Sequence, residues 1–100
     1  MTENEIKKPD LRIDKTGNTY KILEVTAEAD SVMPPHLSTK EAVVIVREGN
    51  AMLEIDGRII YLAPNDVFII PSATVHTLSV KNKFKAIIIM ELDSRIEFVN

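Results

Sequence analysis

The chain has 100 residues, 45% of them apolar, which is enough for one domain with a modest core and too short for several domains. Twelve lysines and arginines against fifteen acidic residues give a formal net charge of −3, which argues against a nucleic acid partner. The longest apolar runs, 42–46 and 86–90, have five residues each, whereas crossing a membrane takes roughly 20, so no membrane partner is expected.

The side chains offer little reactive chemistry. There is no cysteine, which excludes disulfides, thiolate nucleophiles and cysteine-bound zinc. The two histidines, His36 and His76, are the side chains that can act as bases or nitrogen ligands near neutral pH. The first eight residues have no apolar segment behind their charges, so a secretory signal is not predicted and we expect a cytoplasmic protein.

In chain order, residues 1–10 are charged and lack periodicity, which predicts a flexible N-terminal arm before a single domain over 11–100. From residue 11 onward, short runs rich in valine and isoleucine alternate with turn signals, among them Pro34-Pro35, a pattern typical of an all-β protein. Strands are predicted at 19–27, 42–48, 50–56, 58–62, 66–70, 75–80 and 84–91, with further candidates at 11–14 and 95–99.

Two turns predict tight hairpins. Asp56-Gly57 lies between two apolar strands and suits a turn that needs positive φ, which glycine adopts without a Cβ clash. Gly49-Asn50 repeats the pattern one hairpin earlier. The resulting meander needs other strands to cover one face, since a lone hairpin is marginal in water. The expected fold is therefore a closed barrel or a sandwich.

The spacing of residues between Asp30 and Val80 resembles the cupin family, whose two motifs are G-x5-H-x-H-x3-E-x6-G and G-x5-P-x-G-x2-H-x3-N. The first motif falls on Asp30, His36, Ser38, Ala42 and Gly49, and the second on Asn65, Pro71, Ala73, His76 and Val80. The resemblance implies an all-β fold, a small antiparallel β-barrel of the double-stranded β-helix, or jelly-roll, type.

The resemblance also locates a candidate site. In metal-binding cupins, two histidines and a glutamate of the first motif and the histidine of the second bind one ion inside the barrel. Those positions read His36, Ser38, Ala42 and His76 here. Alanine cannot ligate a metal and serine is a poor ligand, so the resemblance implies a degenerate metal site. No cofactor is expected beyond a divalent metal held weakly by His36 and His76.

Two local patterns bear on this site. His76, Leu78 and Val80 alternate with polar residues, which turns the His76 ring toward the apolar interior. Glu41 adjoins the vacant glutamate position, but neighbouring side chains on a strand point to opposite faces, so only a bulge would bring this carboxylate inside. The predicted ligand-binding residues are His36, Ser38, Ala42, His76 and Leu78.

Several functions fit these residues, and the catalytic residues, if any, stay unassigned. The first is a binding domain that holds a small organic or anionic ligand between His36 and His76. The second is a metal-free enzyme similar to the cupin epimerases, with a histidine base and Tyr20 or Tyr61 as acid. The third is a metal-dependent oxygenase or isomerase that adds an unforeseen carboxylate. The fourth is an oligomerisation module whose interior is filled by side chains. Met33, Met52 and Met90 could line an adaptable apolar pocket, although ordinary core packing is the favoured interpretation.

A partner subunit is also expected. Residues 42–46 and 86–90 are apolar at odd and even positions alike, so both faces of each strand need cover. One face meets the interior, and no helix is predicted over the other. We therefore expect a homodimer held by apolar burial, which the resemblance to small cupins also implies.

Overall fold

The computed structural model describes residues 7–99, which form ten strands in two five-stranded sheets and contain no helix. Sheet A has the order β1 (Asp10–Thr16), β2 (Tyr20–Ala27), β9 (Phe84–Glu91), β4 (Ala42–Glu48) and β7 (Val67–Ile70). Sheet B has the order β10 (Ile96–Phe98), β3 (Val32–Ser38), β8 (His76–Val80), β5 (Ala51–Ile55) and β6 (Arg58–Leu62). Within 7–99 there is accordingly no helical segment with the length and hydropathy of a membrane span.

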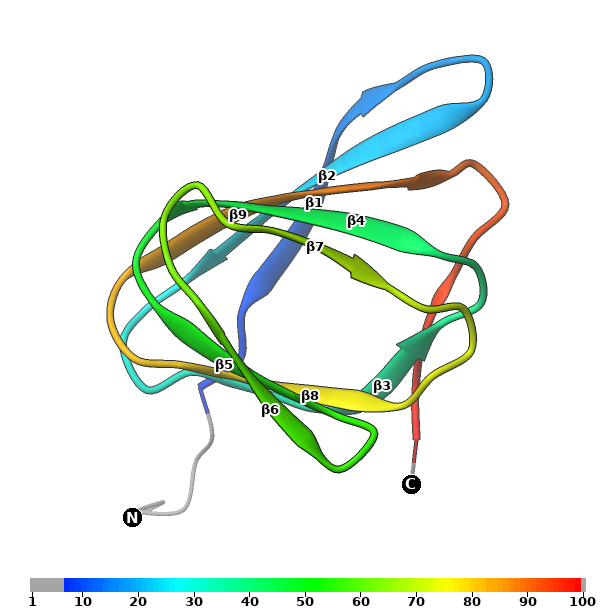
Figure 1. The fold of residues 1–100 in the computed structure, drawn as a ribbon. Helices are drawn as coiled ribbons and strands as arrows, with labels where there is room; N and C mark the ends of the chain where they lie inside the picture. The colour runs from blue at the N-terminus through cyan, green and yellow to red at the C-terminus, as the bar shows by residue number, and fades with distance from the viewer. Residues whose placement is uncertain (1–6, 100) are drawn as a thin grey trace, which may run out of the picture.

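The two sheets face each other as two layers, with sheet A above sheet B in the view of Figure 1. All strand pairs are antiparallel, which confirms the all-β prediction. The expected closed barrel is not observed. Among the described strands, the hydrogen-bonded ladders run within each sheet and none connects the two sheets. The arrangement is consistent with a double-stranded β-helix.

All the predicted strands are confirmed, but the tight hairpin predicted at Gly49-Asn50 is wrong, because β4 and β5, which this turn connects, pair with other strands in different sheets. All seven main predictions match observed strands to within one residue at each end, and the candidates at 11–14 and 95–99 correspond to β1 and β10. The Asp56-Gly57 turn has the predicted positive φ, at 50° and 71°. Residues 1–6 of the predicted arm lie outside the described residues. Its later part is bonded to the domain, because the Val32 N–H donates to the Lys7 carbonyl at 2.8 Å.

Strand β3 is not among the predicted strands, because the sequence indicates a turn at Pro34-Pro35, and these prolines instead lie within the strand. Proline lacks the N–H that a ladder requires, so in a sheet it is confined to edges and bulges. The register between β3 and β8 shifts by one residue between Met33 and His36, which marks a bulge at the prolines. The bulge puts Met33 and His36 on the same, inward face although they are three residues apart.

The core lies between the sheets and follows the alternation of the strands. Inward residues of β4 and β9 are buried, with Val46 and Phe84 each only 1% exposed. The next residues along each strand point outward, as period-two geometry requires. Burial of the inward set is the main favourable contribution to folding. The same alternation directs several side chains of β3 and β8 toward the interior, where the candidate site lies.

Candidate functional site

A row of side chains crosses sheet B through both histidines. Phe98 of β10 pairs with His36 of β3, His36 pairs with His76 of β8, and His76 pairs with Ile55 of β5. Paired residues on adjacent strands share a face, so the two imidazoles are direct neighbours. Their ring centroids are 4.1 Å apart with an interplanar angle of 61°, and both residues are buried. This cross-strand contact joins the histidines of the two motifs.

The histidines border an internal cavity of about 50 Å³ between the two sheets. All five predicted ligand-binding residues line it: His36, Ser38, Ala42, His76 and Leu78. The remaining lining residues are apolar and come from both sheets: Val25, Met33, Val44, Leu53, Leu62, Ile70, Phe84, Ala86, Ile88, Met90 and Ile96. The cavity therefore has one small polar region, made by the two imidazoles and the Ser38 hydroxyl, in an apolar surround.

Backbone carbonyls orient both imidazole rings. His36 Nδ1 lies 2.7 Å from the Pro34 carbonyl oxygen, and His76 Nδ1 lies 2.8 Å from the Thr74 carbonyl oxygen. Burial lowers the pKa of His36 to about 4, against the opposing effect of the Pro34 hydrogen bond and with a smaller contribution from the charge of His76. Burial likewise lowers the pKa of His76. Both rings are therefore neutral at pH 7.

The residues of this cavity do not fit the four-ligand metal centre that the family motifs imply. Two imidazoles are present, but Ser38 and Ala42 stand where the other histidine and the glutamate are expected. Among residues 7–99, no three His, Cys, Asp or Glu side chains gather where they could hold an ion. Two neutral imidazoles leave most of a divalent ion's coordination to water. The chemistry of the donor set thus favours hydrogen bonding over tight metal binding.

The carboxylate needed by a metal-dependent enzyme is not supplied by Glu41. This residue is exposed and outside the cavity lining, while Ala42 faces inward and pairs in regular register with Ile70 and Met90. The bulge in β4 lies at the other end of the strand, between Val46 and Glu48. No bulge therefore turns Glu41 inward.

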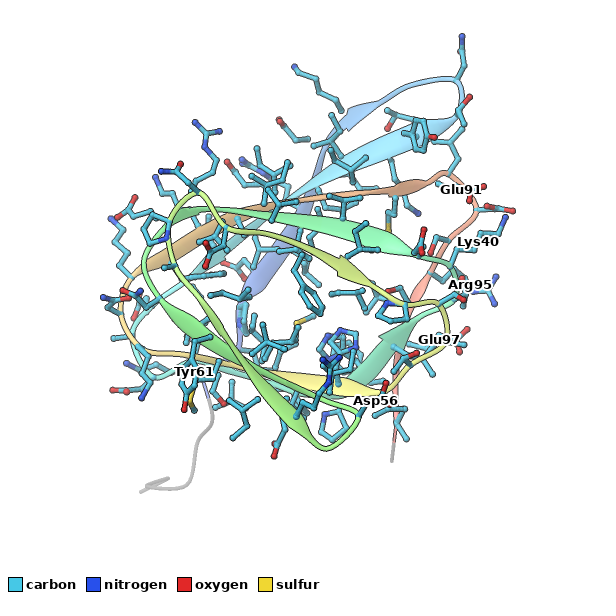
Figure 2. All side chains as sticks on the ribbon, in the orientation of Figure 1. Lys40, Asp56, Tyr61, Glu91, Arg95 and Glu97 are labelled. Atoms are coloured by element: carbon cyan, nitrogen blue, oxygen red, sulfur yellow. The ribbon has the colours of Figure 1, made fainter. Side chains whose placement is uncertain are left out.

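The acid needed by the epimerase-like alternative is also not at the cavity. Tyr20 is 56% exposed and Tyr61 is 71% exposed, and neither lines the cavity. Figure 2 shows Tyr61 on the outer side of the lower sheet, away from Lys40 and Arg95. An exposed phenol on an outward face cannot reach a substrate held beside the histidines. Met33 and Met90 do line the cavity, whereas Met52 does not.

Ion pairs and hydrogen bonds hold the β9–β10 connection at one end of the molecule. Lys40, in the β3–β4 turn, contacts Glu91 at 3.4 Å and Asp93 at 3.0 Å. The Lys40 backbone N–H donates a hydrogen bond to Oγ of the fully buried Ser94, with 3.2 Å between nitrogen and oxygen. Figure 2 shows Lys40, Glu91, Arg95 and Glu97 together at this end. These contacts determine where β10 begins, and so place Ile96 and Phe98 beside the cavity.

Phe98 is a site residue that sequence reasoning did not identify. Its ring centroid lies 5.6 Å from that of His36, yet the side chain is 57% exposed, so it extends the histidine row to the solvent. Ile96 lines the cavity from the same strand. Ile96 and Phe98 are two residues apart, which is the spacing of neighbours on one face of a strand. A strand of three residues is too short for this alternation to be recognised in the sequence.

Three residues at glycine positions of the motifs have positive φ in this chain. Asp30, Asn65 and Ala73 occupy positions at which the motifs have glycine, and their φ angles are 68°, 76° and 54°. Side chains other than glycine rarely adopt positive φ because of Cβ clashes. Each of these positions therefore has a backbone conformation that favours glycine, the residue of the motifs.

Comparison with known proteins agrees with this geometry. A family model described as a cupin domain matches residues 23–90, which include both histidines. None of the curated proteins matches the chain. A cupin superfamily protein from Desulfitobacterium hafniense superposes with a TM-score of 0.77 at 19% identity, over 91% of this chain and 84% of that one.

Two further solved structures are similar. A cupin-2 domain protein from Shewanella frigidimarina has a TM-score of 0.72 at 25% identity, over 88% of this chain and 83% of that one. Salicylate 1,2-dioxygenase from Pseudoaminobacter salicylatoxidans has a TM-score of 0.72 at 17% identity. This match covers 79% of this chain but only 24% of the dioxygenase. At these identities the structural likeness concerns the fold.

Proposed function

Because the chain belongs to the cupin domain family, we propose that it is a small-molecule-binding domain whose ligand occupies the cavity beside His36 and His76 without a complete metal site. The observation that carries this proposal is the lining of the cavity. Two imidazoles and one hydroxyl form its polar region, and every other lining side chain is apolar. A few convergent polar groups in an apolar concavity are typical of small-ligand sites.

The second candidate is a metal-dependent dioxygenase, favoured by the likeness to salicylate 1,2-dioxygenase. It needs a third protein ligand for the metal. Glu41, the carboxylate next to the vacant glutamate position of the motif, points outward, and Ala42 takes the inward position. The binding domain is the better proposal because it requires only the side chains that line the cavity.

Filling the cavity tests the binding function. We expect that fragments of about four heavy atoms, added to isotopically labelled protein, will shift amide NMR signals of Ser38, Ala42 and Leu78. Ala42→Leu inserts three carbons into the cavity lining, and should abolish these shifts. Val43→Leu changes the adjacent outward residue and should leave them unchanged. Shifts that survive Ala42→Leu, or that map only to outward residues, would refute the proposal.

We further propose that the protein is a homodimer joined through the outer face of sheet A. Seven outward residues of β2, β4, β7 and β9 form an aliphatic surface: Ile22, Val43, Ile45, Val67, Ile69, Ile87 and Ile89. Val67 and Ile69 are 61% and 53% exposed. A contiguous aliphatic surface of this kind is typical of a protein interface.

Matched substitutions test the dimer. Wild-type protein should scatter light as a particle of twice 11.2 kDa at micromolar concentration. Ile69→Lys should shift the population to monomer, because a lysine ammonium would be desolvated in the interface. Ile59→Lys is the control, since Ile59 is 51% exposed on β6 of the other sheet. A monomeric wild type, or equal dissociation by both variants, would contradict this assembly.

A further inference from the structure

The hydrogen bonds of the two imidazoles determine which ring nitrogens carry protons. A carbonyl oxygen can only accept a hydrogen bond, so the Nδ1 atoms facing Pro34 and Thr74 must both be N–H donors. In a neutral imidazole with a protonated Nδ1, the Nε2 atom has a lone pair and no hydrogen. Both rings therefore present an acceptor, and neither presents a donor, at Nε2.

Both acceptors are available to a ligand. Among residues 7–99, the two imidazoles form side-chain hydrogen bonds only through Nδ1. No side-chain nitrogen or oxygen in this part of the chain is both sealed from water and without a partner. The Nε2 atoms are therefore reachable by a water-sized group, although His36 is 5% and His76 is 4% exposed. With ring centroids 4.1 Å apart, one small ligand can contact both rings.

The rest of the cavity offers almost nothing to an anion. No lysine or arginine lines it, and apart from the Nδ1–H groups bonded to carbonyls, the Ser38 hydroxyl is the one side-chain donor among the described lining residues. A carboxylate placed there would direct its lone pairs at those of the two Nε2 atoms. It would also lose its hydration without gaining a cation, which is the costly case for a buried charge. A group with N–H or O–H donors would instead satisfy both nitrogens.

Resting on the proposed binding function, we propose that the ligand is a small uncharged molecule that presents two hydrogen-bond donors, such as a primary amide or a diol, to the Nε2 atoms of His36 and His76. The sequence alone left open whether the ligand is a neutral organic molecule or an anion. The proposed ligand is the neutral organic molecule. One bound water needs about 10–15 Å³, so a cavity of about 50 Å³ encloses only a few ligand atoms. The donor group itself and one or two carbons fill that space.

Isosteric probes test this class directly. Acetamide, isopropanol, acetone and acetate each have four heavy atoms but differ in donors and charge. Ligands of this size bind weakly, so titrations at millimolar concentration are followed by the side-chain NMR signals of both histidines. We expect acetamide to bind at least about tenfold more tightly than acetone or acetate, because only acetamide satisfies both acceptors. Isopropanol, with one donor, should lie between them.

Two further measurements separate a failed inference from a failed function. Nitrogen-15 spectra of the wild-type imidazoles should show hydrogen on Nδ1 and none on Nε2, without any variant. His76→Phe keeps a ring in the core and removes one acceptor, so the preference for acetamide over acetone should fall below about threefold. His36→Phe gives the same test if the first variant does not fold.

The outcomes are distinct. Acetone or acetate binding in the cavity as tightly as acetamide would overturn the donor class while leaving a binding domain in place. Hydrogen on either Nε2 in the spectra would overturn it in the same way. If none of the four probes shifts a histidine signal, and Ala42→Leu changes no fragment binding, then both the inference and the proposed function are wrong.

Discussion

Gly49→Ala is expected to destabilise the protein by more than about 4 kcal/mol, at the extreme end of single substitutions. Gly49 has a φ of +85°, and a Cβ built on it would lie 2.1 Å from the Lys83 carbonyl oxygen. It would also lie 3.0 Å from Lys83 C and Phe84 Cα. All three are backbone atoms, so relief requires moving the start of β9, where Phe84 is 1% exposed in the core.

Gly57→Ala is the matched control for this prediction. Gly57 also has a positive φ, +71°, but a Cβ there would meet nothing within 4 Å. Gly57→Ala should therefore lower the free energy of unfolding only by the penalty of placing alanine in the left-handed conformation, about 1–2 kcal/mol. Urea denaturation at one fixed protein concentration measures both variants, since dimerisation would make apparent stability concentration-dependent. Equal losses of stability in the two variants would contradict the close approach of Gly49 to the start of β9.

Rebuilding the missing ligands should convert the cavity into a metal site. Ser38 and Ala42 line the cavity together with His36 and His76, so Ser38→His with Ala42→Glu would assemble three imidazoles and one carboxylate around one volume. We expect the double variant to bind Fe²⁺, Mn²⁺ or Zn²⁺ at least about a hundredfold more tightly than wild type, since even indirect supporting groups change metal affinity by 10 to 100. Either single substitution should gain less.

The same variant should also couple metal binding to stability. The larger side chains must share about 50 Å³, so the metal-free variant should be less stable than wild type. Added metal should then raise its melting temperature, because a ligand that binds only the native state stabilises it. Ser38→His with Thr77→Glu serves as control, because Thr77 lies between the inward residues His76 and Leu78 and is absent from the cavity lining.

Metal analysis of untagged wild-type protein completes this test. We expect well under one equivalent of any transition metal, because two imidazoles do not complete a protein ligand set. Stoichiometric metal that is lost on His36→Ala or His76→Ala would reject the binding-domain proposal. It would also make the metal-dependent enzyme the better account of the family likeness.

Local patterns in the sequence were sufficient for most strands, and the family resemblance indicated five of the residues that line the cavity. Runs such as 42–46 and 84–91 alternate or stay apolar over enough residues to define a strand, and the match of motif spacing placed His36 and His76 together. The strand prediction rests on short-range chemistry: side-chain branching, turn residues and the period of two. It needed no knowledge of the partner strand, whereas the placing of the two histidines in one site is what the resemblance to the cupin motifs implied.

The remaining features depended on contacts between distant residues. The bulge at Pro34-Pro35 exists because β8 pairs with both ends of β3, and this pairing turns His36 inward beside Met33. Phe98 reaches His36 only because β10 adds to the edge of sheet B, and the carbonyls of Pro34 and Thr74 decide the proton positions on the rings. The sequence and its family resemblance thus indicated five residues that line the cavity. The tertiary structure decided how those residues are paired and which ring nitrogens donate, because cross-strand register and hydrogen-bond direction arise only when the sheet is assembled.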